Sequence, residues 1–301
     1  LNFEYRDSKI NFLNSCLTND QNYLKDVYDA LVLGTKDYVE KNNFKGVLIG
    51  SSGGIDSALT AAIAFDALGK GRVKTIMMPF DFTADISIED AGSLAKNLGI
   101  EHSEISIKEM YESFSLALKE SFEGMGIDKT EENLQSRCRG VTLMALSNKL
   151  GFLVLTTGNK SEAAVGYSTL YGDTAGGFSV LKDVSKTLVY ELANYRNSLS
   201  VVIPKRIIER PPSAELAPDQ KDTDSLPDYD RLDPIIEMYV EDDKSIQEII
   251  NEGFDEKEVR RIVSLIDFNE YKRRQAPLGI KISDRNFGKD RRYPITNSWK
   301  P

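Results

Sequence analysis

The sequence predicts an α/β fold with a doubly wound parallel sheet, followed by a helical C-terminal appendage. Two observations indicate this fold. Between residues 23 and 156, short apolar runs alternate with longer segments of helical period. Residues 200–301 show mainly helical patterns interrupted by prolines. Strands that alternate with helices pair in parallel, because each helix returns the chain to the same edge of the sheet.

The first elements follow a polar start. Residues 1–22 are Asn-rich and weakly patterned, and we expect them to form a linker or extension. A helix is predicted over residues 23–39, where apolar residues recur at a helical period. Gly46 to Gly50 is a short apolar run bounded by glycines, as in a buried parallel strand. Small apolar residues from Ala58 to Ala67 predict the next helix.

The alternation continues to residue 156. A strand is predicted over Val73 to Met78, and Ser87 is the expected N-cap of a helix that ends at Leu98. Glu89 and Asp90 would be favourable in the first turn of that helix. The remaining pattern predicts a strand over 101–107, helices over 108–122 and 131–150, and a strand over 152–156.

The C-terminal part has a different sequence pattern, with more prolines and no predicted strands. Its prolines exclude regular helix from an acidic stretch that contains Pro204, Pro211, Pro212, Pro218 and Pro227. Helices are predicted over 234–240, 245–251 and 256–269. A basic tail follows, with Lys272-Arg273-Arg274 and Arg291-Arg292. We therefore expect one domain over 23–301, of which 200–301 is a mostly helical part and not an independent fold.

Composition excludes several classes of protein. The net charge of -9 argues against nucleic acid as a partner, because proteins that bind nucleic acid need a clustered basic surface. No apolar run approaches the roughly 18 residues of a membrane span. Two cysteines, Cys16 and Cys138, and the single His102 give no disulfide framework and no Cys or His metal cluster. We expect a cytoplasmic protein. The first residue is Leu1 and the first methionine is Met77, so we expect either a trimmed start or an upstream domain left out.

The segment between the first predicted strand and its helix is rich in glycine and serine: Gly50-Ser51-Ser52-Gly53-Gly54-Ile55-Asp56-Ser57. Adjacent glycines let the backbone approach a ligand closely, and successive amides beside a helix N-terminus favour an anion. Asp56 would repel phosphate directly, but as a Mg²⁺ ligand it would bridge to phosphate oxygens. The segment has no GKS or GKT ending and no G-x-G-x-x-G pattern. The alternative is a Gly-Gly turn capped by serines.

The pattern SGGxDS resembles the N-type ATP pyrophosphatases, which cleave ATP between its α- and β-phosphates. Further motifs resemble one family of that class, the NAD⁺ synthetases, and within it the synthetase portion of the glutamine-dependent form. The resemblance runs from about Asp26 to about Asn297, and it rests on Glu132 to Arg139, Thr156 to Glu162, Gly166 to Asp173, Gly176-Gly177, Leu181 to Thr187, Arg210 to Leu216 and Tyr271 to Gln275. It implies an adenine nucleotide α-hydrolase-like fold.

The resemblance also implies roles for individual residues. Gly50 to Ser57 would hold the ATP phosphates and then pyrophosphate, and Asp56 and Glu162 would bind Mg²⁺. Further ATP contacts would come from Met78, Thr157, Lys186 and Ser213. Deamido-NAD would be held by Asn133, Arg137, Glu162, Tyr167, Ser168, Thr169, Leu170, Asp173 and Lys272. Asp56 and Glu162 both follow predicted strands at their carboxyl ends, where doubly wound sheets place ligands.

Several of these residues have plainer interpretations. Glu162 could be a solvated surface glutamate, and Lys186 an exposed helix lysine. Arg137 and Arg139 are two residues apart, hence on different faces of a helix, so we expect only one to touch ligand and prefer Arg137. Cys138 has no neighbouring base in the sequence, so we expect buried packing and not a nucleophile. We expect His102 to be structural. The run Phe80-Asp81 departs from the family pattern, and we assign no contact there.

The implied activity is that of a ligase that forms a C–N bond in the last step of NAD⁺ biosynthesis. Deamido-NAD would attack the α-phosphorus of ATP, and ammonia would then displace AMP from the adenylated intermediate. Other pyrophosphatase-loop activities, such as GMP synthesis or tRNA thiolation, are alternatives, although thiolation wants paired cysteines and a basic surface. A nucleotide sensor without turnover is another. The resemblance further implies a homodimer. We expect this chain to use free ammonium, unless a glutaminase domain or subunit supplies ammonia from glutamine.

Overall fold

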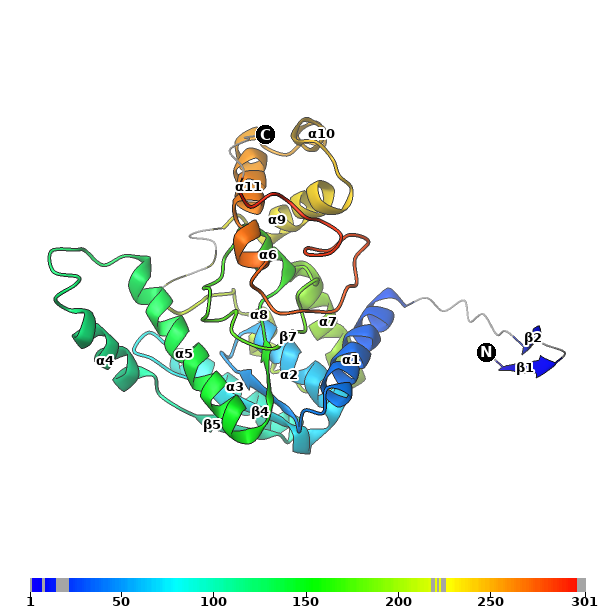
Figure 1. Cartoon of the computed structure of the whole chain (residues 1–301), viewed down its shortest axis with the longest axis horizontal. Coiled ribbons are helices and arrows are strands. Elements are labelled where there is room, and N and C mark those ends of the chain that lie inside the picture. Colours follow the sequence, from blue (N-terminus) through cyan, green and yellow to red (C-terminus); the bar gives the residue numbers. More distant parts are fainter. Residues whose placement is uncertain are drawn as a thin grey trace.

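The computed structural model describes residues 2–6, 9–14, 22–217, 220, 222 and 226–296. Within these ranges a five-stranded sheet carries helices on both faces, and a helical cluster lies at one end of the molecule (Figure 1). No helix in this part of the chain is long and apolar enough to cross a membrane.

The central sheet is entirely parallel. Its strand order is β5 (Glu101–Glu104), β4 (Val73–Met77), β3 (Val47–Gly50), β6 (Leu153–Thr156) and β7 (Phe178–Ser179). The chain moves outward from β3 to β5 and then returns to the other side of β3. The strand order therefore reverses between β3 and β6, which is where such sheets bind ligands. The predicted doubly wound fold is confirmed.

Helices cover both faces of this sheet. On one face lie α1 (Tyr23–Lys41), α2 (Ile55–Leu68), α3 (Asp85–Leu98) and α7 (Lys186–Leu199), and on the other α4 (Lys108–Leu118) and α5 (Lys129–Leu150). Val47 and Ile49 of β3 pack into the first layer, whereas Leu48 packs with Cys138 and Leu143 of α5. Because both faces are covered, β3 is apolar without alternation.

A second core forms among the helices beyond the strands. It contains α6 (Lys160–Val165), α9 (Tyr229–Ile236), a π-helical turn (Glu237–Glu241), α10 (Ile246–Asn251) and α11 (Glu256–Phe268), followed by the short α12 (Glu270–Arg273). The Asp183 carboxylate joins it to the sheet layers: it accepts the N–H groups of Ile282 and Ser283, each at 2.9 Å, and pairs with Lys160.

The predicted N-cap of α3 is wrong. The helix begins at Asp85, and its N-cap, Ala84, makes no side-chain capping bond. Ser87 instead lies in the first turn and donates its hydroxyl to Glu215 at 2.6 Å, while the Ala84 N–H donates to the same carboxylate at 3.3 Å. A carboxylate distant in sequence thus takes the part of the local cap, because an anion is favoured at a helix N-terminus.

The proline-rich stretch, predicted to contain no regular helix, does contain one. A short helix, α8 (Lys205–Glu209), forms inside this stretch. Pro204 is its N-cap, where a missing N–H costs nothing, and the helix ends before Pro211. The helix predicted to start at residue 234 begins earlier, at Tyr229, so Pro234 lies within α9. The strand β7 and the helices α6 and α7 were not predicted.

Two strands lie in the segment that was predicted to be a linker. β1 (Asn2–Arg6) and β2 (Lys9–Asn14) pair antiparallel, with Phe3 opposite Phe12 and Tyr5 opposite Ile10. The sequence carried this signal, because apolar residues alternate with polar ones in both strands. Cys16 and Pro218 lie outside the described residues.

Candidate active site

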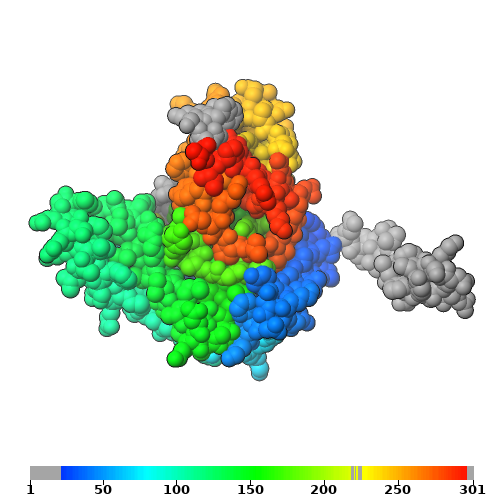
Figure 2. All heavy atoms as spheres, viewed as in Figure 1, coloured from blue at the N-terminus to red at the C-terminus, as the bar shows by residue number. Residues whose placement is uncertain are grey.

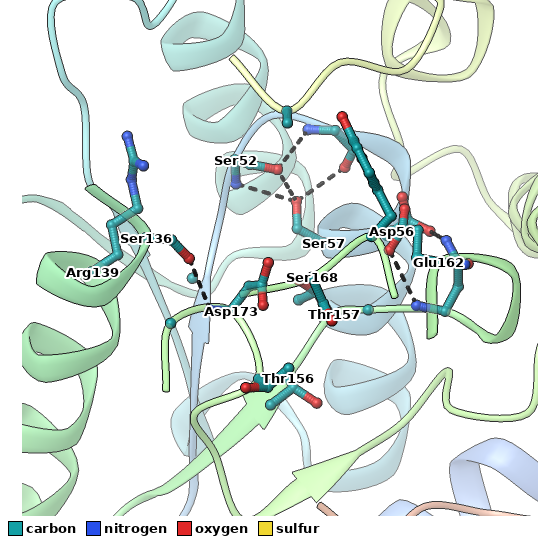
Figure 3. Close-up of a pocket in the computed structure, with 18 of the residues that line it drawn as sticks. Ser52, Asp56, Ser57, Ser136, Arg139, Thr156, Thr157, Glu162, Ser168 and Asp173 are labelled. Atoms are coloured by element: carbon teal, nitrogen blue, oxygen red, sulfur yellow. Dashed lines mark hydrogen bonds between the residues drawn. The ribbon is translucent and has the colours of Figure 1, made fainter. Parts of the chain in front are cut away.

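The loop between β3 and α2 lines a pocket and is held by hydrogen bonds among its own residues (Figure 3). The Ser57 hydroxyl donates to the Gly54 carbonyl at 3.0 Å, and the Gly54 N–H donates to Ser52 Oγ at 3.2 Å. Gly53 has a φ of +75°, and a Cβ there would lie 2.3 Å from the backbone oxygen of Ser87. Only glycine fits this position, so the loop geometry depends on it.

Asp56 lies in the first turn of α2, at the switch point of the sheet. One of its oxygens accepts the Asn159 side-chain amide at 2.8 Å, and the other accepts the Lys186 ammonium at 2.5 Å. The same ammonium lies 3.4 Å from Glu162. Asp56, Glu162 and Lys186 thus form one cluster from α2, α6 and α7.

Local capping fixes the position of Glu162. Asn159 is the N-cap of α6: its side-chain oxygen accepts the Glu162 N–H at 3.0 Å, and Glu162 accepts the Asn159 N–H at 3.4 Å. This reciprocal pair is a capping box. It holds the glutamate at the start of the helix, where the helix dipole favours a negative charge.

Burial decides the electrostatics of the cluster. The Lys186 side chain is 2% exposed and that of Glu162 18%, so neither is the solvated surface residue of the plainer interpretation. Burial raises the pKa of Glu162 to about 8, while the Lys186 ammonium lowers it and the Asp56 carboxylate raises it. Burial alone would lower the pKa of Lys186, but the two carboxylates outweigh it and hold that pKa above its usual range. Lys186 therefore stays protonated between two acidic groups.

The donor set of the cluster fits magnesium. No three Asp, Glu, His or Cys side chains gather as a complete metal cage within the described ranges. Mg²⁺ commonly takes one or two carboxylates and completes its shell with phosphate oxygens and water. Asp56 and Glu162 offer two carboxylates beside a glycine loop suited to phosphate, so a metal held jointly with a nucleotide fits these residues.

Most of the predicted ligand contacts line this one pocket. All of the residues predicted to bind ATP line it: Gly50, Ser51, Ser52, Gly53, Gly54, Ile55, Asp56, Ser57, Met78, Thr157, Lys186 and Ser213. Of the residues predicted for deamido-NAD, the pocket is lined by Glu162, Tyr167, Ser168, Asp173 and Lys272. The Lys272 ammonium donates to the carbonyls of Gly166 and Ser168 at 2.7 and 2.8 Å.

Four residues predicted for deamido-NAD lie outside the pocket lining: Asn133, Arg137, Thr169 and Leu170. They contact one another in pairs. The Thr169 hydroxyl donates to Asn133 at 2.7 Å, and Arg137 Nε donates to the Leu170 carbonyl at 3.2 Å. Arg137 is exposed.

Arg139 is the α5 arginine that lines the pocket. Its Nε donates to the Met78 carbonyl at 3.0 Å, and burial lowers its pKa to about 10. The two arginines do lie on different faces of α5. Within this chain the face toward the pocket carries Arg139, not the preferred Arg137.

Other pocket residues were missed by the sequence analysis. Asn159 carried a local signal, because an Asn three residues before a Glu is a capping pattern. Asp222 carried none: it accepts the hydroxyls of Tyr167 at 3.3 Å and Tyr229 at 2.9 Å. Lys182 also lines the pocket, and burial lowers its pKa.

Cys138 and His102 lie away from this chemistry. Cys138 is buried in α5, as predicted, and burial raises the pKa of its thiol. His102 lies on β5, with its Nδ1 2.9 Å from the Thr75 hydroxyl, and it does not line the pocket.

Comparisons with known proteins agree on one family. Residues 27–276 match the sequence profile of the NAD synthase family. The glutamine-dependent NAD(+) synthetase of Acinetobacter baylyi is 55% identical over 280 residues, which cover 92% of this chain and 52% of that protein. The chain thus spans about half the length of the curated relatives it matches.

Solved structures give a similar result. The glutamine-dependent NAD+ synthetase of Acinetobacter baumannii, in complex with adenosine diphosphate, matches with a TM-score of 0.64 and 49% identity, over 96% of this chain and 52% of that one. The NMN synthetase of Francisella tularensis matches with a TM-score of 0.70 and 30% identity, over 83% of this chain and 95% of that one.

Proposed function

The chain belongs to the NAD synthase family, and on that premise we propose that it amidates deamido-NAD to NAD⁺ at the expense of ATP. The proposed reaction releases AMP and pyrophosphate and takes ammonia as the nitrogen donor. The enzyme is then a ligase that forms a C–N bond.

One observation supports this proposal: residues predicted to bind two different ligands line a single pocket. The glycine-serine loop, Asp56 and Lys186 line it on one side, as a site for nucleotide phosphates requires. Tyr167, Ser168, Asp173 and Lys272 line the same pocket and are the residues that the family resemblance assigns to the second substrate. Two substrates must meet for one to be adenylylated by the other.

The ATP site is proposed around the loop. Gly50 to Ser57 would hold the phosphates, and Lys186 and Ser213 would reach them as cation and hydroxyl donor. Thr157 and Met78 would complete the nucleotide site. The buried, protonated Lys186 supports this part, because a fixed cation stabilises the charge that develops as pyrophosphate leaves.

Asp56 and Glu162 are proposed as the residues that hold Mg²⁺. When bound, the ion would neutralise phosphate charge at the reacting centre. Asp56→Ala should abolish ATP-dependent NAD⁺ formation, a loss of about a thousandfold or more. Asp66→Asn, at the other end of α2, is the matched control and should keep most of the turnover. Near-normal turnover of Asp56→Ala would contradict the metal assignment.

The proposed reaction has two steps. A nicotinate carboxylate oxygen attacks the α-phosphorus of ATP, and pyrophosphate departs with the bonding electron pair. Ammonia then attacks the acyl carbon, loses a proton, and releases AMP. The chain's share is to position the two substrates and to balance charge, and no protein nucleophile is needed.

A product assay tests this function. The chain is incubated with ATP, deamido-NAD, Mg²⁺ and ammonium, and NAD⁺, AMP and pyrophosphate should form in equal amounts. Nucleotide binding without pyrophosphate release would favour the sensor alternative. ADP and inorganic phosphate would exclude pyrophosphatase chemistry.

The similarity to an NMN synthetase suggests a second candidate substrate, the mononucleotide that carries a nicotinate carboxylate where NMN carries an amide. Both substrates offer the same nicotinate carboxylate, and only deamido-NAD carries a second nucleotide half. We expect deamido-NAD to have the higher kcat/KM by about tenfold or more, because additional binding contacts can be used in the transition state. The opposite preference would assign the chain to the mononucleotide.

The nitrogen donor is proposed to be ammonia at this site. Relatives twice as long are named glutamine-dependent, so a glutaminase domain or subunit is the expected source in the whole protein. Rates with ammonium and with glutamine, measured on this chain, test the proposal. Efficient use of glutamine by residues 1–301 alone would contradict it.

We also propose a homodimer that completes the deamido-NAD site. The α4–α5 pair projects from the body (Figure 2) and exposes Met125, Ile127 and Val141, which are 72%, 90% and 61% exposed. Arg137, assigned to deamido-NAD but outside the pocket, lies on the same helix as Val141. A second copy on this face would explain both observations. Light scattering should give a dimer mass, and Val141→Glu should yield monomers with a raised KM for deamido-NAD.

The proposed domain division keeps residues 1–22 as an extension and 23–301 as one synthetase unit with its helical part at 200–301. We propose a cytoplasmic location, where ATP is available, with small-molecule substrates and neither nucleic acid nor membrane as partner. Cell fractionation would test the location.

A further inference from the structure

A buried carboxylate on α9 joins the two helices that carry Glu162 and Lys186. Asp233 is 8% exposed. One of its oxygens accepts the Ser161 hydroxyl, and the other accepts both the N–H and the hydroxyl of Thr187, each at 2.9 Å. Three donors therefore converge on one side chain from two different helices.

Both partners of Asp233 are sequence neighbours of cluster residues. Ser161 precedes Glu162 on α6, and Thr187 follows Lys186 on α7. The Ser161 hydroxyl oxygen also accepts the backbone N–H of Lys186 at 2.9 Å, so the two helix starts are bonded to each other as well. The first turns of α6 and α7 are thus fixed relative to one another by a single hydrogen-bonded unit.

The charge of Asp233 suits this place. It makes no ion pair within 4 Å among the described residues, and one of its three hydrogen bonds comes from the backbone N–H of Thr187, in the first turn of α7. Such N–H groups lack partners within their helix, and an anion there is stabilised by the helix dipole.

A second residue on the same face of α9 supports Lys186. Tyr229 is four residues before Asp233, so the two lie one helical turn apart. The Lys186 ammonium lies 5.3 Å from the centre of the Tyr229 ring, within cation–π distance. The helix α9 therefore contacts α7 at the Thr187 backbone and at the Lys186 side chain.

From these contacts we propose that Asp233 is a positioning residue: it sets the distance between Lys186 and Glu162, and so the geometry in which the cluster receives MgATP. The proposal rests on the proposed function for its kinetic readout, but not for its structural one. Asp233 does not line the pocket, and its effect passes through Ser161 and Thr187.

Asp233→Asn tests the proposal with little change in volume. An amide has one acceptor oxygen in place of two, so it cannot accept the Ser161 hydroxyl and both Thr187 groups, and the link between the two helix starts is weakened. We expect kcat to fall by about tenfold to a hundredfold and the Mg²⁺ concentration for half-maximal rate to rise. KM for deamido-NAD should change by less than about twofold, because all of its predicted contacts except Glu162 lie away from the first turns of α6 and α7. An unchanged kcat and Mg²⁺ dependence would overturn the proposal.

Asp66→Asn is the matched control. Asp66 is the partner of Arg196, at the far end of the same α7 helix. Its replacement should lower thermal stability without the change in Mg²⁺ dependence. An equal loss of kcat in both variants would assign Asp233 a merely structural role. If Asp233→Asn fails to fold, Ser161→Ala removes one of the same bonds and should lower kcat in the same direction; an unchanged kcat would then overturn the proposal.

Amide hydrogen exchange separates this inference from the proposed function. Asp233→Asn should speed exchange of the Thr187 amide, which donates to Asp233, and of the Lys186 amide, which donates to Ser161 Oγ, by about tenfold or more, because Asp233 holds both the Thr187 amide and the Ser161 hydroxyl in place. Asp66→Asn should leave them protected. This result stands even if deamido-NAD is not the substrate. Unchanged protection in Asp233→Asn would overturn the inference whatever the substrate is.

Discussion

The ammonium of Lys186 lies 2.5 Å from the Asp56 carboxylate, although 130 residues separate the two in sequence. Glu162 joins them at 3.4 Å. Without the ammonium, two acidic groups would face one another at the edge of a pocket. Lys186 therefore holds the carboxylates together in the nucleotide-free protein, besides its proposed contact with phosphate.

Lys186→Met should destabilise the metal-free protein. Removing one partner of a buried ionic cluster typically costs about 3–5 kcal/mol, because the remaining charges are uncompensated. Mg²⁺ should recover part of that loss, since a divalent cation can take the place of the ammonium. Thermal unfolding in a chelator and then in Mg²⁺ measures both effects.

Arg196→Met is the control for that experiment. Arg196 is also buried on α7, but its ionic partner is the single carboxylate of Asp66. It should lose stability without recovery by Mg²⁺. A Lys186→Met variant as stable as the wild type, or one recovered no better than Arg196→Met, would contradict the cluster described above.

The glycine loop gives a second prediction from two neighbouring residues. Gly53→Ala should unfold the loop, because its φ is +75° and the added Cβ would lie 2.3 Å from the Ser87 backbone oxygen. At Gly54 the nearest atom to an added Cβ is Ser52 Oγ at 3.2 Å, and no positive φ is required. We expect Gly53→Ala to cost about 2 kcal/mol or more and Gly54→Ala clearly less. Denaturant titrations compare them, and equal losses would refute the prediction.

His102 gives a prediction about pH. Burial lowers its pKa below the usual 6.5, while Glu104 raises it. The folded state then binds fewer protons at this residue than the unfolded chain. Its contribution to stability is full above pH 6.5 and is lost as the pH falls toward the folded pKa. The His102→Gln variant should lose this contribution to the pH dependence of stability and should retain the turnover of the wild type.

NMR measures the His102 prediction directly. The chain has one histidine, so a single imidazole resonance reports the titration. Its midpoint should lie below 6.5. A midpoint at or above that value, or loss of turnover in His102→Gln, would show that the residue has another role.

Local signals explain what could be predicted from the sequence. The strand β3 and the loop after it were predicted because apolar runs, glycines and serines act within a few residues. The meeting of Asp56 and Glu162 followed from a general rule, that the carboxyl ends of adjacent parallel strands share one edge. The capping box of Asn159 and Glu162 is equally local, because its two residues are three positions apart in the sequence.

Contacts distant in sequence explain what could not. The start of α3 depends on Glu215, which is more than a hundred residues away in the chain. The inward face of α5 could not be chosen, because apolar and polar residues are spread around that helix, and so Arg139 was passed over. The bonds of Asp233 to α6 and α7 likewise exist only once three helices have packed.

An isotope experiment tests the central claim, activation of a carboxylate by adenylylation, most directly. Deamido-NAD labelled with ¹⁸O in its nicotinate carboxylate is turned over with ATP, Mg²⁺ and ammonium, and the products are analysed by mass spectrometry. Attack on the α-phosphorus predicts one labelled oxygen in AMP and none in pyrophosphate. Label in inorganic phosphate, or AMP formed without label, would contradict the account.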